Sequence, residues 1–522
     1  MVESLMLAIA LGLCCAAWLL PPSSIASAQN QIPSDGAWSE TLRYTTEPEQ
    51  YPFRAVLEEI ALLGMGLGQY LSNHAGNSVD WDYQYNWTDF RSKISGSGYS
   101  VDTNAFDTNF ITHPASGTMY YWAARGNRLP VLTSALYAFT ASLLWELLGE
   151  FREKASVNDM LVTPVAGLVL GETTFQLGTF FDRSCASTAN RVLGALLGAS
   201  KTLHDAIDGV EPSRDVQCDQ WGLSRSGTHE FRLALGEDAV VPLRGRDAGS
   251  GGAVFAESRF ELETKRVALS AYGQEGHGLK TFSDGNASDL WLHTGLSNNG
   301  YTDFTLGARV MAVGMHFRSL AQALQGVVGD EMLFGLQLAT EYSVHRYSPG
   351  VNEHKDRVFT LDVPGVRFDY RRHQGAVRWE LGLSGSVTWA GIDAFALPTY
   401  LQQGGSVDGL TSVAAGQGYN YAAGFTLEPS ARLVARPLEM GVSLQGMRLW
   451  GLRTLDRDPD RSQGLEIAEA RYRSTLWIAF GPLFHLLRLR LWSQTLSRWG
   501  SMDALRVSRG EFRLGASAEA LL

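Results

Sequence analysis

Residues 331–345 read EMLFGLQLATEYSVH, and apolar side chains occupy every second position along most of this stretch. Residues 377–389, VRWELGLSGSVTW, repeat the pattern, as do shorter stretches at 304–312 and 487–491. Successive side chains of a β-strand point to opposite faces of a sheet, so a period of two predicts strands with one apolar and one polar face. The second half of the chain is therefore expected to be a β-sheet structure.

About twelve such segments lie between Thr228 and Ala520. Several run past the usual length of about five or six residues and reach the roughly 9–11 residues that a strand needs to cross a bilayer. Polar or glycine-rich connections, such as 297–300 and 404–418, separate them. A soluble β-sandwich shows the same alternation with its apolar face inward. Strand length favours the other arrangement, in which the apolar face meets lipid.

Tryptophans near the ends of the predicted strands also favour a transmembrane barrel, since aromatic residues collect where a barrel wall meets the membrane interface. Trp389, Trp450 and Trp492 are examples. We therefore predict an α+β chain: an N-terminal helical domain, followed at residues 222–522 by an antiparallel transmembrane β-barrel of about 12 strands.

Composition excludes some other classes of protein. The 522 residues contain 45% hydrophobic residues, only 19% charged residues and 55 glycines. Intrinsic disorder requires low hydrophobicity and high charge density, which this chain lacks. The formal net charge of −11 provides no basic surface for nucleic acid.

The first 28 residues are predicted to be a secretory signal peptide. An apolar run from Leu5 to Leu20 precedes two prolines, and Ala26-Ser27-Ala28 fits a cleavage site with small residues. Glu3 is irregular there, because this region of a signal peptide usually carries a positive charge. Residues 29–50 are expected to be a mobile lead-in. Export and a barrel together predict the bacterial outer membrane, with membrane lipid and the barrel-assembly machinery as partners.

Two cysteines, Cys185 and Cys218, remain after the predicted cleavage. In an oxidising compartment they can form one disulfide. Two unpaired thiols are the alternative.

Residues 51–210 show a helical pattern and are predicted to form the first domain, with a polar boundary at 210–225. The predicted helices span residues 54–71, 114–125, 134–153, 157–181 and 191–207. Pro114 suits a first helical position and Gly126 a C-terminal cap. Glycines four residues apart, such as Gly167 and Gly171, allow helices to approach closely in membranes, and less often in soluble bundles. No segment reaches the length expected of a transmembrane helix, residues 129–145 coming nearest.

One block of the helical half combines polar and small residues in a distinctive order. It comprises Asp107-Thr108-Asn109, His113-Pro114, Gly117, Tyr120-Tyr121, Arg125, Trp145-Glu146, Glu150, Ser156 to Asp159, Thr163-Pro164, Gly167 and Gly171-Glu172. This block resembles an uncharacterised bacterial envelope family, a domain of unknown function found in predicted outer-membrane proteins. The resemblance covers roughly residues 100–175, implies an envelope location and brings no activity.

The candidate site residues come from this block. The catalytic candidates are His113 as a general base, with Glu146 or Asp159 to orient it. The binding candidates are Asp107, Asn109, Tyr121, Arg125, Glu150 and Glu172. Asp107, Asn109, His113 and Glu146 contain metal-ligand types, although no metal or cofactor is assigned.

Each candidate also has a structural interpretation, which we favour. Glu146 and Glu150 share one helix face, and a carboxylate facing an apolar interior needs a polar partner. Ser156 and Asp159 have the spacing of a capping box, and Arg125 complements a helix C-terminus.

Two functions fit these features. In the first, the helical domain plugs, caps or docks on the barrel, and the pair has a structural role or passes a small solute. The alternative is a lipid-modifying hydrolase or acyltransferase that uses His113 and a carboxylate, with both groups meeting at a pocket. Enzymatic activity is the less expected outcome, because the chain has neither a Gly-x-Ser-x-Gly elbow nor a phosphate-binding glycine loop. The helical domain is expected to be periplasmic or inside the barrel.

Overall fold

The computed structural model describes residues 49–74, 87–95, 99–100, 104–150, 154–211, 214, 218–225, 227–243, 245, 253–298, 300–347, 354–407, 413–452, 466–483 and 487–521. The predicted signal peptide and nearly all of the predicted lead-in lie outside the described residues.

The second half of the chain forms a closed antiparallel barrel of twelve strands, as the sequence predicted. Each strand pairs with its neighbours in sequence, and β14 pairs with β3 to close the wall. The strands are β3 (Thr228–Leu243), β4 (Phe255–Val267), β5 (Gly276–Ser297), β6 (Gly300–Ala323), β7 (Gly326–Tyr347), β8 (His354–Gln374), β9 (Val377–Asp393), β10 (Tyr419–Ala435), β11 (Leu438–Gly451), β12 (Ile467–Leu483), β13 (Leu487–Met502) and β14 (Leu505–Leu521).

Most large apolar side chains point out of the barrel, and most charged side chains point in. Leu235 on β3 and Phe425 on β10 are each 61% exposed, whereas Arg498 and Arg513 on the last two strands are almost completely buried in the interior. A soluble β-sandwich would bury its apolar faces instead. The outward direction of the apolar side chains is that of a barrel whose outer wall faces hydrocarbon.

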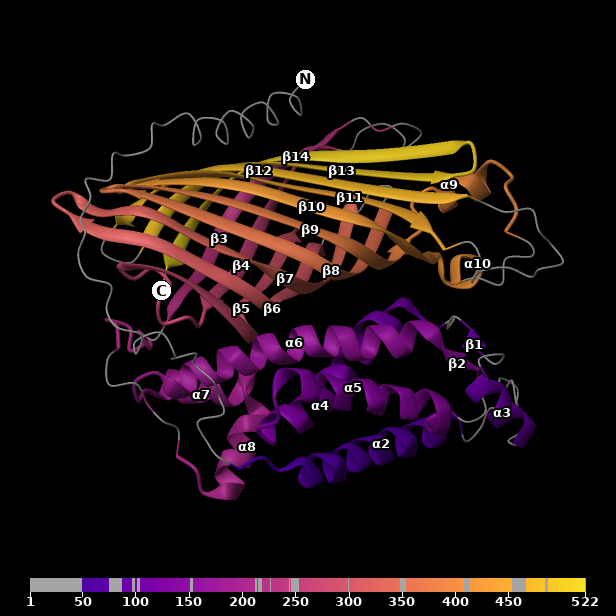
Figure 1. Cartoon of the computed structure of the whole chain (residues 1–522). Coiled ribbons are helices and arrows are strands. Elements are labelled where there is room, and N and C mark those ends of the chain that lie inside the picture. Colours follow the sequence, from indigo (N-terminus) through magenta and orange to yellow (C-terminus); the bar gives the residue numbers. More distant parts are fainter. Residues whose placement is uncertain are drawn as a thin grey trace.

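The two ends of the barrel differ. Two-residue turns join β6 to β7, β8 to β9 and β10 to β11 at one end, which we call the short-turn end. The connections 394–418 and 452–466 lie at the opposite end. The first of these carries the short helices α9 (Leu397–Gln402) and α10 (Val413–Gln417), and we call this the α9 end (Figure 1).

The first half is helical, as predicted, with adjusted boundaries. Its elements are α2 (Pro52–His74), α3 (Trp87–Ser95), the π-helix η1 (Thr108–Thr112), α4 (His113–Gly126), α5 (Val131–Leu144), the π-helix η2 (Trp145–Gly149), α6 (Val157–Arg183), α7 (Thr188–Leu197) and α8 (Ala199–Asp208), with the two-residue strands β1 (Tyr99–Ser100) and β2 (Ala155–Ser156) paired in parallel. The helix expected at 191–207 is wrong as a single element: it is α7 and α8, which meet at Gly198. Helix α3 was not predicted.

Two helices are long and apolar enough to cross a membrane, and they span Val131–Gly149 and Val157–Arg183. The expectation that no segment reaches this length is therefore wrong. The π-helix η2 continues α5 past the charged residue Glu146, and Pro164 lies inside α6 without ending it.

Helices α4 and α6 pack closely because small residues lie where they cross. A Cβ atom on Gly117 would come within 1.8 Å of the Thr163 carbonyl oxygen, and one on Gly167 within 2.3 Å of the Gly117 backbone. The predicted role of Gly167 in close helix approach is confirmed.

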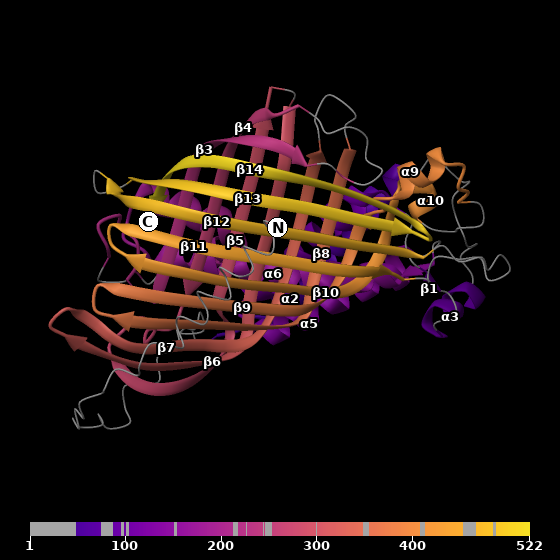
Figure 2. The same ribbon diagram turned by 90° about the horizontal axis from the view of Figure 1, so that it is seen from above.

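Helix α6 lies along the outside of the barrel (Figures 1 and 2). Near its middle, Val169 packs against Ala308 and Val310 of β6. These two side chains alternate with Arg309, which lines the lumen. The barrel side chains beneath α6 are therefore those of the outer wall.

Contacts at both ends of α6 place the helical domain along the full height of this wall. At the short-turn end, Phe180 and Phe181 pack against Phe231 of β3. At the α9 end, Phe110 of η1 stacks on Phe359 of β8 with 4.8 Å between ring centres. The described contacts are therefore between the helical half and the outer side of the wall.

The disulfide between Cys185 and Cys218 is formed and joins the end of α6 to the segment that leads into β3. The sequence allowed either a disulfide or two unpaired thiols, and the structure has the disulfide.

Substitution of Gly117 by Val should separate α4 from α6. The added side chain would clash with the backbone of Thr163. Overpacking of this kind costs about 1–3 kcal/mol. We expect protease sensitivity of the helical domain to begin at a lower temperature. Gly64→Val in α2 is the matched control, because nothing lies within 4 Å of a Cβ there. Equal stability of the two variants would contradict this account of the packing.

Candidate functional site

Glu172 is the centre of a buried cluster in the helical domain. Its carboxylate accepts hydrogen bonds from Tyr121 Oη at 2.6 Å, Arg125 Nε at 2.9 Å and Gln176 Nε2 at 2.6 Å. The Arg125 guanidinium also lies 4.5 Å from the centre of the Phe175 ring. The three predicted residues Tyr121, Arg125 and Glu172 are thus brought together, in an arrangement that holds α4 to α6.

Asp107 and Asn109 contact the barrel. Tyr342 Oη on β7 donates to Asp107 Oδ1 at 3.1 Å. The Asn109 amide donates to Tyr419 Oη at 3.0 Å and to Tyr421 Oη at 2.8 Å, both on β10. These two residues attach η1 to the outer wall, and their side chains do not join His113 and Glu146 in the contacts described.

Glu146 and Asp159 lie at the start of α6. Glu146 Oε2 accepts a hydrogen bond from the Ser156 backbone N–H at 2.7 Å. The Ser156 hydroxyl in turn accepts one from the Asp159 backbone N–H, at 3.2 Å, and this confirms the predicted cap. Both carboxylates are buried. The Glu146 carboxylate and the Ser156 hydroxyl thus satisfy backbone donors at a helix N-terminus, which need such partners, whereas the Asp159 carboxylate accepts a hydrogen bond from the Asn158 side-chain amide at 2.7 Å.

His113 lies beside Asp159, with 3.7 Å between Nε2 and Oδ2, which is longer than a hydrogen bond. It lines a cavity of about 290 Å³ together with Tyr120, Glu150 and Trp145. Glu150 Oε1 accepts a hydrogen bond from Trp145 Nε1 at 2.9 Å. Among the described residues, Glu146 and Asp159 do not line this cavity.

A second cavity, of about 420 Å³, lies in the barrel lumen. Seven acidic and seven basic side chains line it, so its formal charge is balanced. Arg367, Lys265 and Asp369 are typical: Asp369 Oδ2 is 2.9 Å from Arg367 Nη2 and 3.1 Å from Lys265 Nζ. The lining comes mainly from the half of the barrel nearer the short-turn end.

Three of the lumen side chains have the geometry of metal ligands. Glu261, Glu263 and His293 can bring one ligand atom each within 4.8 Å of the others. Arg232 already supplies positive charge here, with its guanidinium 2.8 Å from Glu261 Oε2. Ion pairing therefore accounts for these carboxylates.

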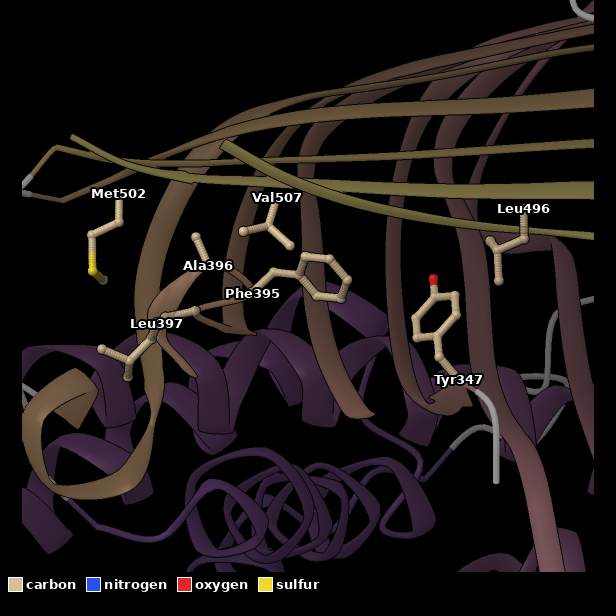
Figure 3. Close-up of a cluster of buried hydrophobic side chains, with 8 residues drawn as sticks. Tyr347, Phe395, Ala396, Leu397, Leu496, Met502 and Val507 are labelled. Atoms are coloured by element: carbon tan, nitrogen blue, oxygen red, sulfur yellow. The ribbon is translucent and has the colours of Figure 1, made fainter. Parts of the chain in front are cut away.

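A short segment packs against inward-facing side chains of the barrel at the α9 end. The segment Ala394–Leu397, which joins β9 to α9, folds into the mouth and packs against Tyr347, Leu496, Met502 and Val507 (Figure 3). We call this segment the mouth segment. The Phe395 backbone N–H donates to Glu469 Oε1 at 3.1 Å, and the Arg498 guanidinium lies 4.8 Å from the Phe395 ring centre.

A layer of buried ion pairs lies directly beneath the mouth segment. Arg498 bridges Asp356 at 3.0 Å and Glu469 at 2.6 Å, and Arg513 contacts Glu257 at 3.0 Å. The mouth segment and this layer thus lie together at the α9 end of the barrel.

Sequence reasoning placed the polar positions of the alternating segments, Glu341 and Glu380 among them, on one face, and did not single out any of them as a functional site. The signal was present, because Arg367, Asp369 and Arg371 alternate along β8. The mouth segment was missed, because a stretch of four apolar residues within a connection has no periodicity that would reveal it.

A model of the family described as Domain of unknown function (DUF3943) matches residues 98–200. The match bears out the resemblance seen in the block from Asp107 to Glu172, and it supplies no activity. No curated protein matches the chain.

Several solved structures are similar to the barrel half. The COG4313 outer membrane channel from Pseudomonas putida F1 is 14% identical, with 59% of this chain and 100% of that chain covered and a TM-score of 0.27. The translocator domain of autotransporter NalP from Neisseria meningitidis is 11% identical, with 61% of this chain and 97% of that chain covered and a TM-score of 0.20. The P. putida toluene transporter TodX is 9% identical, with 57% of this chain and 91% of that chain covered and a TM-score of 0.22. Similarities this weak say nothing about what this chain does.

Replacement of Glu172 by Leu should destabilise the helical domain strongly. Removing one partner of a buried ion pair leaves the other charge without compensation, here Arg125, and costs about 3–5 kcal/mol. The double variant Arg125→Met/Glu172→Leu removes both charges and should recover most of that loss. Urea-dependent loss of helical circular dichroism measures both. If the double variant is as unstable as the single one, the ion pair is not the reason for the loss.

Proposed function

We propose that the chain is an outer-membrane barrel that passes small polar or charged solutes, with the mouth segment as its plug and the helical domain docked on its outer wall. The observation that carries this proposal is the lumen cavity of about 420 Å³ with balanced charges. The interior of an outer-membrane barrel is polar, and a cavity of this size gives a small solute room among the charged side chains.

The charge pattern favours solutes that carry polar groups of both signs. Arg432 pairs with Glu230 at 3.0 Å and with Glu439 at 2.8 Å, so cations and anions alternate around the lumen. A solute with a positive and a negative group can exchange with such pairs without leaving either charge uncompensated. An apolar solute would have to separate them.

The mouth segment supports gating at the α9 end. The two longest connections lie there, and in bacterial barrels the longer loops face the cell exterior while short turns face the periplasm. The proposed orientation therefore opens the cavity toward the periplasm and closes it toward the cell surface.

Loss of the apolar contacts of the mouth segment should increase ion conductance. In the variant Phe395→Ser/Leu397→Ser, two buried anchors become polar, so water can enter the mouth. We expect single-channel conductance in planar bilayers to rise several-fold over that of the unaltered chain.

The matched control is Gln402→Ser/Gln403→Ser, which alters two exposed residues of the same connection. Its conductance should equal that of the unaltered chain. A folded Phe395→Ser/Leu397→Ser variant that leaves bilayers as insulating as the control would rule out passage and leave the structural role.

The alternative function, a lipid-modifying hydrolase or acyltransferase, has one observation in its favour: His113 lines a cavity with Tyr120 and Glu150. This function requires His113 and Glu146 to meet at that cavity. Glu146 instead accepts a hydrogen bond from the Ser156 backbone N–H.

His113→Ala tests this alternative directly. We expect no fatty-acid release from phospholipid vesicles by either the unaltered protein or the variant, as measured by mass spectrometry. Turnover that the unaltered protein shows and the folded variant lacks would make lipid modification the function.

A further inference from the structure

We infer that the helical domain lies within the hydrocarbon layer of the membrane, beside the barrel, with lipid acyl chains covering its outward face. This inference goes beyond the proposed passage of solutes and does not depend on it.

The distribution of charge in the helices is the first argument. In the described parts of α2, α4, α5, η2 and α6, no Asp, Glu, Lys or Arg side chain is in the exposed class. The exposed positions instead carry large apolar side chains, such as Phe53, Ile60, Leu132 and Leu136, which are 73%, 60%, 73% and 58% exposed. Water-soluble domains place charged residues on their surface, and a continuous apolar surface of this extent needs a partner.

The interior of the domain shows the opposite character. It holds the ion pair of Arg125 with Glu172, and Lys201 contacts Asp182 at 2.9 Å and Asp205 at 2.7 Å. Charged groups at bilayer depth face the interior of a bundle and pair with one another. The domain is thus apolar outside and ion-paired inside, which is also how the barrel wall is built.

The position of the domain supplies the second argument. Helix α6 has 27 residues, so it is about 40 Å long, which exceeds the roughly 30 Å thickness of the hydrocarbon core. It touches β3 near the short-turn end through Phe231, and η1 beside its start touches β10 near the α9 end through Tyr421. A domain that covers the lipid-facing wall from rim to rim must itself lie at the depth of the lipid.

The barrel side chains beneath the domain are adapted to it. Arg266 is on the outer side of β4, where it would be costly against lipid. Its guanidinium donates to the Gln176 carbonyl oxygen at 2.6 Å and lies 5.1 Å from the Phe180 ring centre. The wall thus carries a buried charge where α6 covers it, and exposed apolar side chains such as Leu235 and Phe425 elsewhere.

A groove at the seam between α6 and the wall fits an acyl chain. It has a volume of about 240 Å³ and is lined by Phe110, Leu161, Val165, Leu361 and Trp389, among others. Since these side chains are apolar and the seam borders the lipid-facing wall, hydrocarbon is the occupant that the surroundings supply.

Spin labelling tests the inference in the full chain, with Cys14 and Cys15 replaced by Ser and the disulfide intact. Ile60→Cys and Leu136→Cys place a nitroxide on the outward face of the helices. Leu514→Cys, 59% exposed on β14, is the lipid-facing control, and Ala504→Cys in the exposed β13–β14 turn is the water-facing control. Leu132→Cys is the second choice on α5 if either helix variant fails to fold.

In proteoliposomes, accessibility to oxygen and to a water-soluble nickel chelate separates the possible surroundings. We expect positions 60 and 136 to match position 514, with high oxygen accessibility and a nickel accessibility about tenfold below that of position 504. Nickel accessibility equal to that of position 504 would place the helices in water and overturn the inference. Low accessibility to both reagents would also overturn it, because a protein partner such as a second copy would then cover the face.

Discussion

The pairing of β14 with β3 is the interaction on which the rest of the molecule depends. A sheet at membrane depth cannot leave a row of backbone donors and acceptors unpaired, because no water is present to satisfy them. Closure removes both edges and fixes the inward or outward direction of every side chain at once. The twelve strands then send their charges to one common lumen and their apolar side chains to one common outer wall. Helix α6 packs on the outside of that wall, and the mouth segment packs on its inside.

Both halves of the chain bury charged side chains and expose apolar ones, the barrel with strands and the helical domain with helices. In the barrel, alternation places Arg498 inside and Leu514 outside. In the helical domain, the three- and four-residue spacing of a helix places Glu172 inside and leaves Leu136 on the surface. The polar groups that attach one half to the other, Asp107 and Asn109 on the helical side, are satisfied by tyrosine hydroxyls of the wall. A tyrosine suits that place because its ring is apolar while its tip forms hydrogen bonds.

Local patterns predicted the elements but not the contacts between distant ones. The period of two in 331–345 and 377–389 was enough for β7 and β9, and the cap of Ser156 over Asp159 was visible from spacing alone. The role of Asn109 could not be predicted from the sequence, because its partners Tyr419 and Tyr421 lie about three hundred residues away in the chain. Likewise, the charges of the lumen were recognisable as a polar face, but their pairing depends on which strands closure brings opposite one another. Phe395 was missed because a loop that folds inward has no periodicity to reveal it.

The carboxylate of Glu172 in the middle of α6 has a consequence for the order of events on the way to the membrane. An isolated apolar helix with a charge at its centre enters a bilayer poorly, since such a residue costs about 2.5–3.5 kcal/mol on insertion scales. In an exported chain, helix α6 alone would therefore be a poor stop signal at the inner membrane. Once Tyr121, Arg125 and Gln176 surround the carboxylate, that cost is offset. The same residue would thus favour export before the domain folds, and it holds α4 to α6 afterwards.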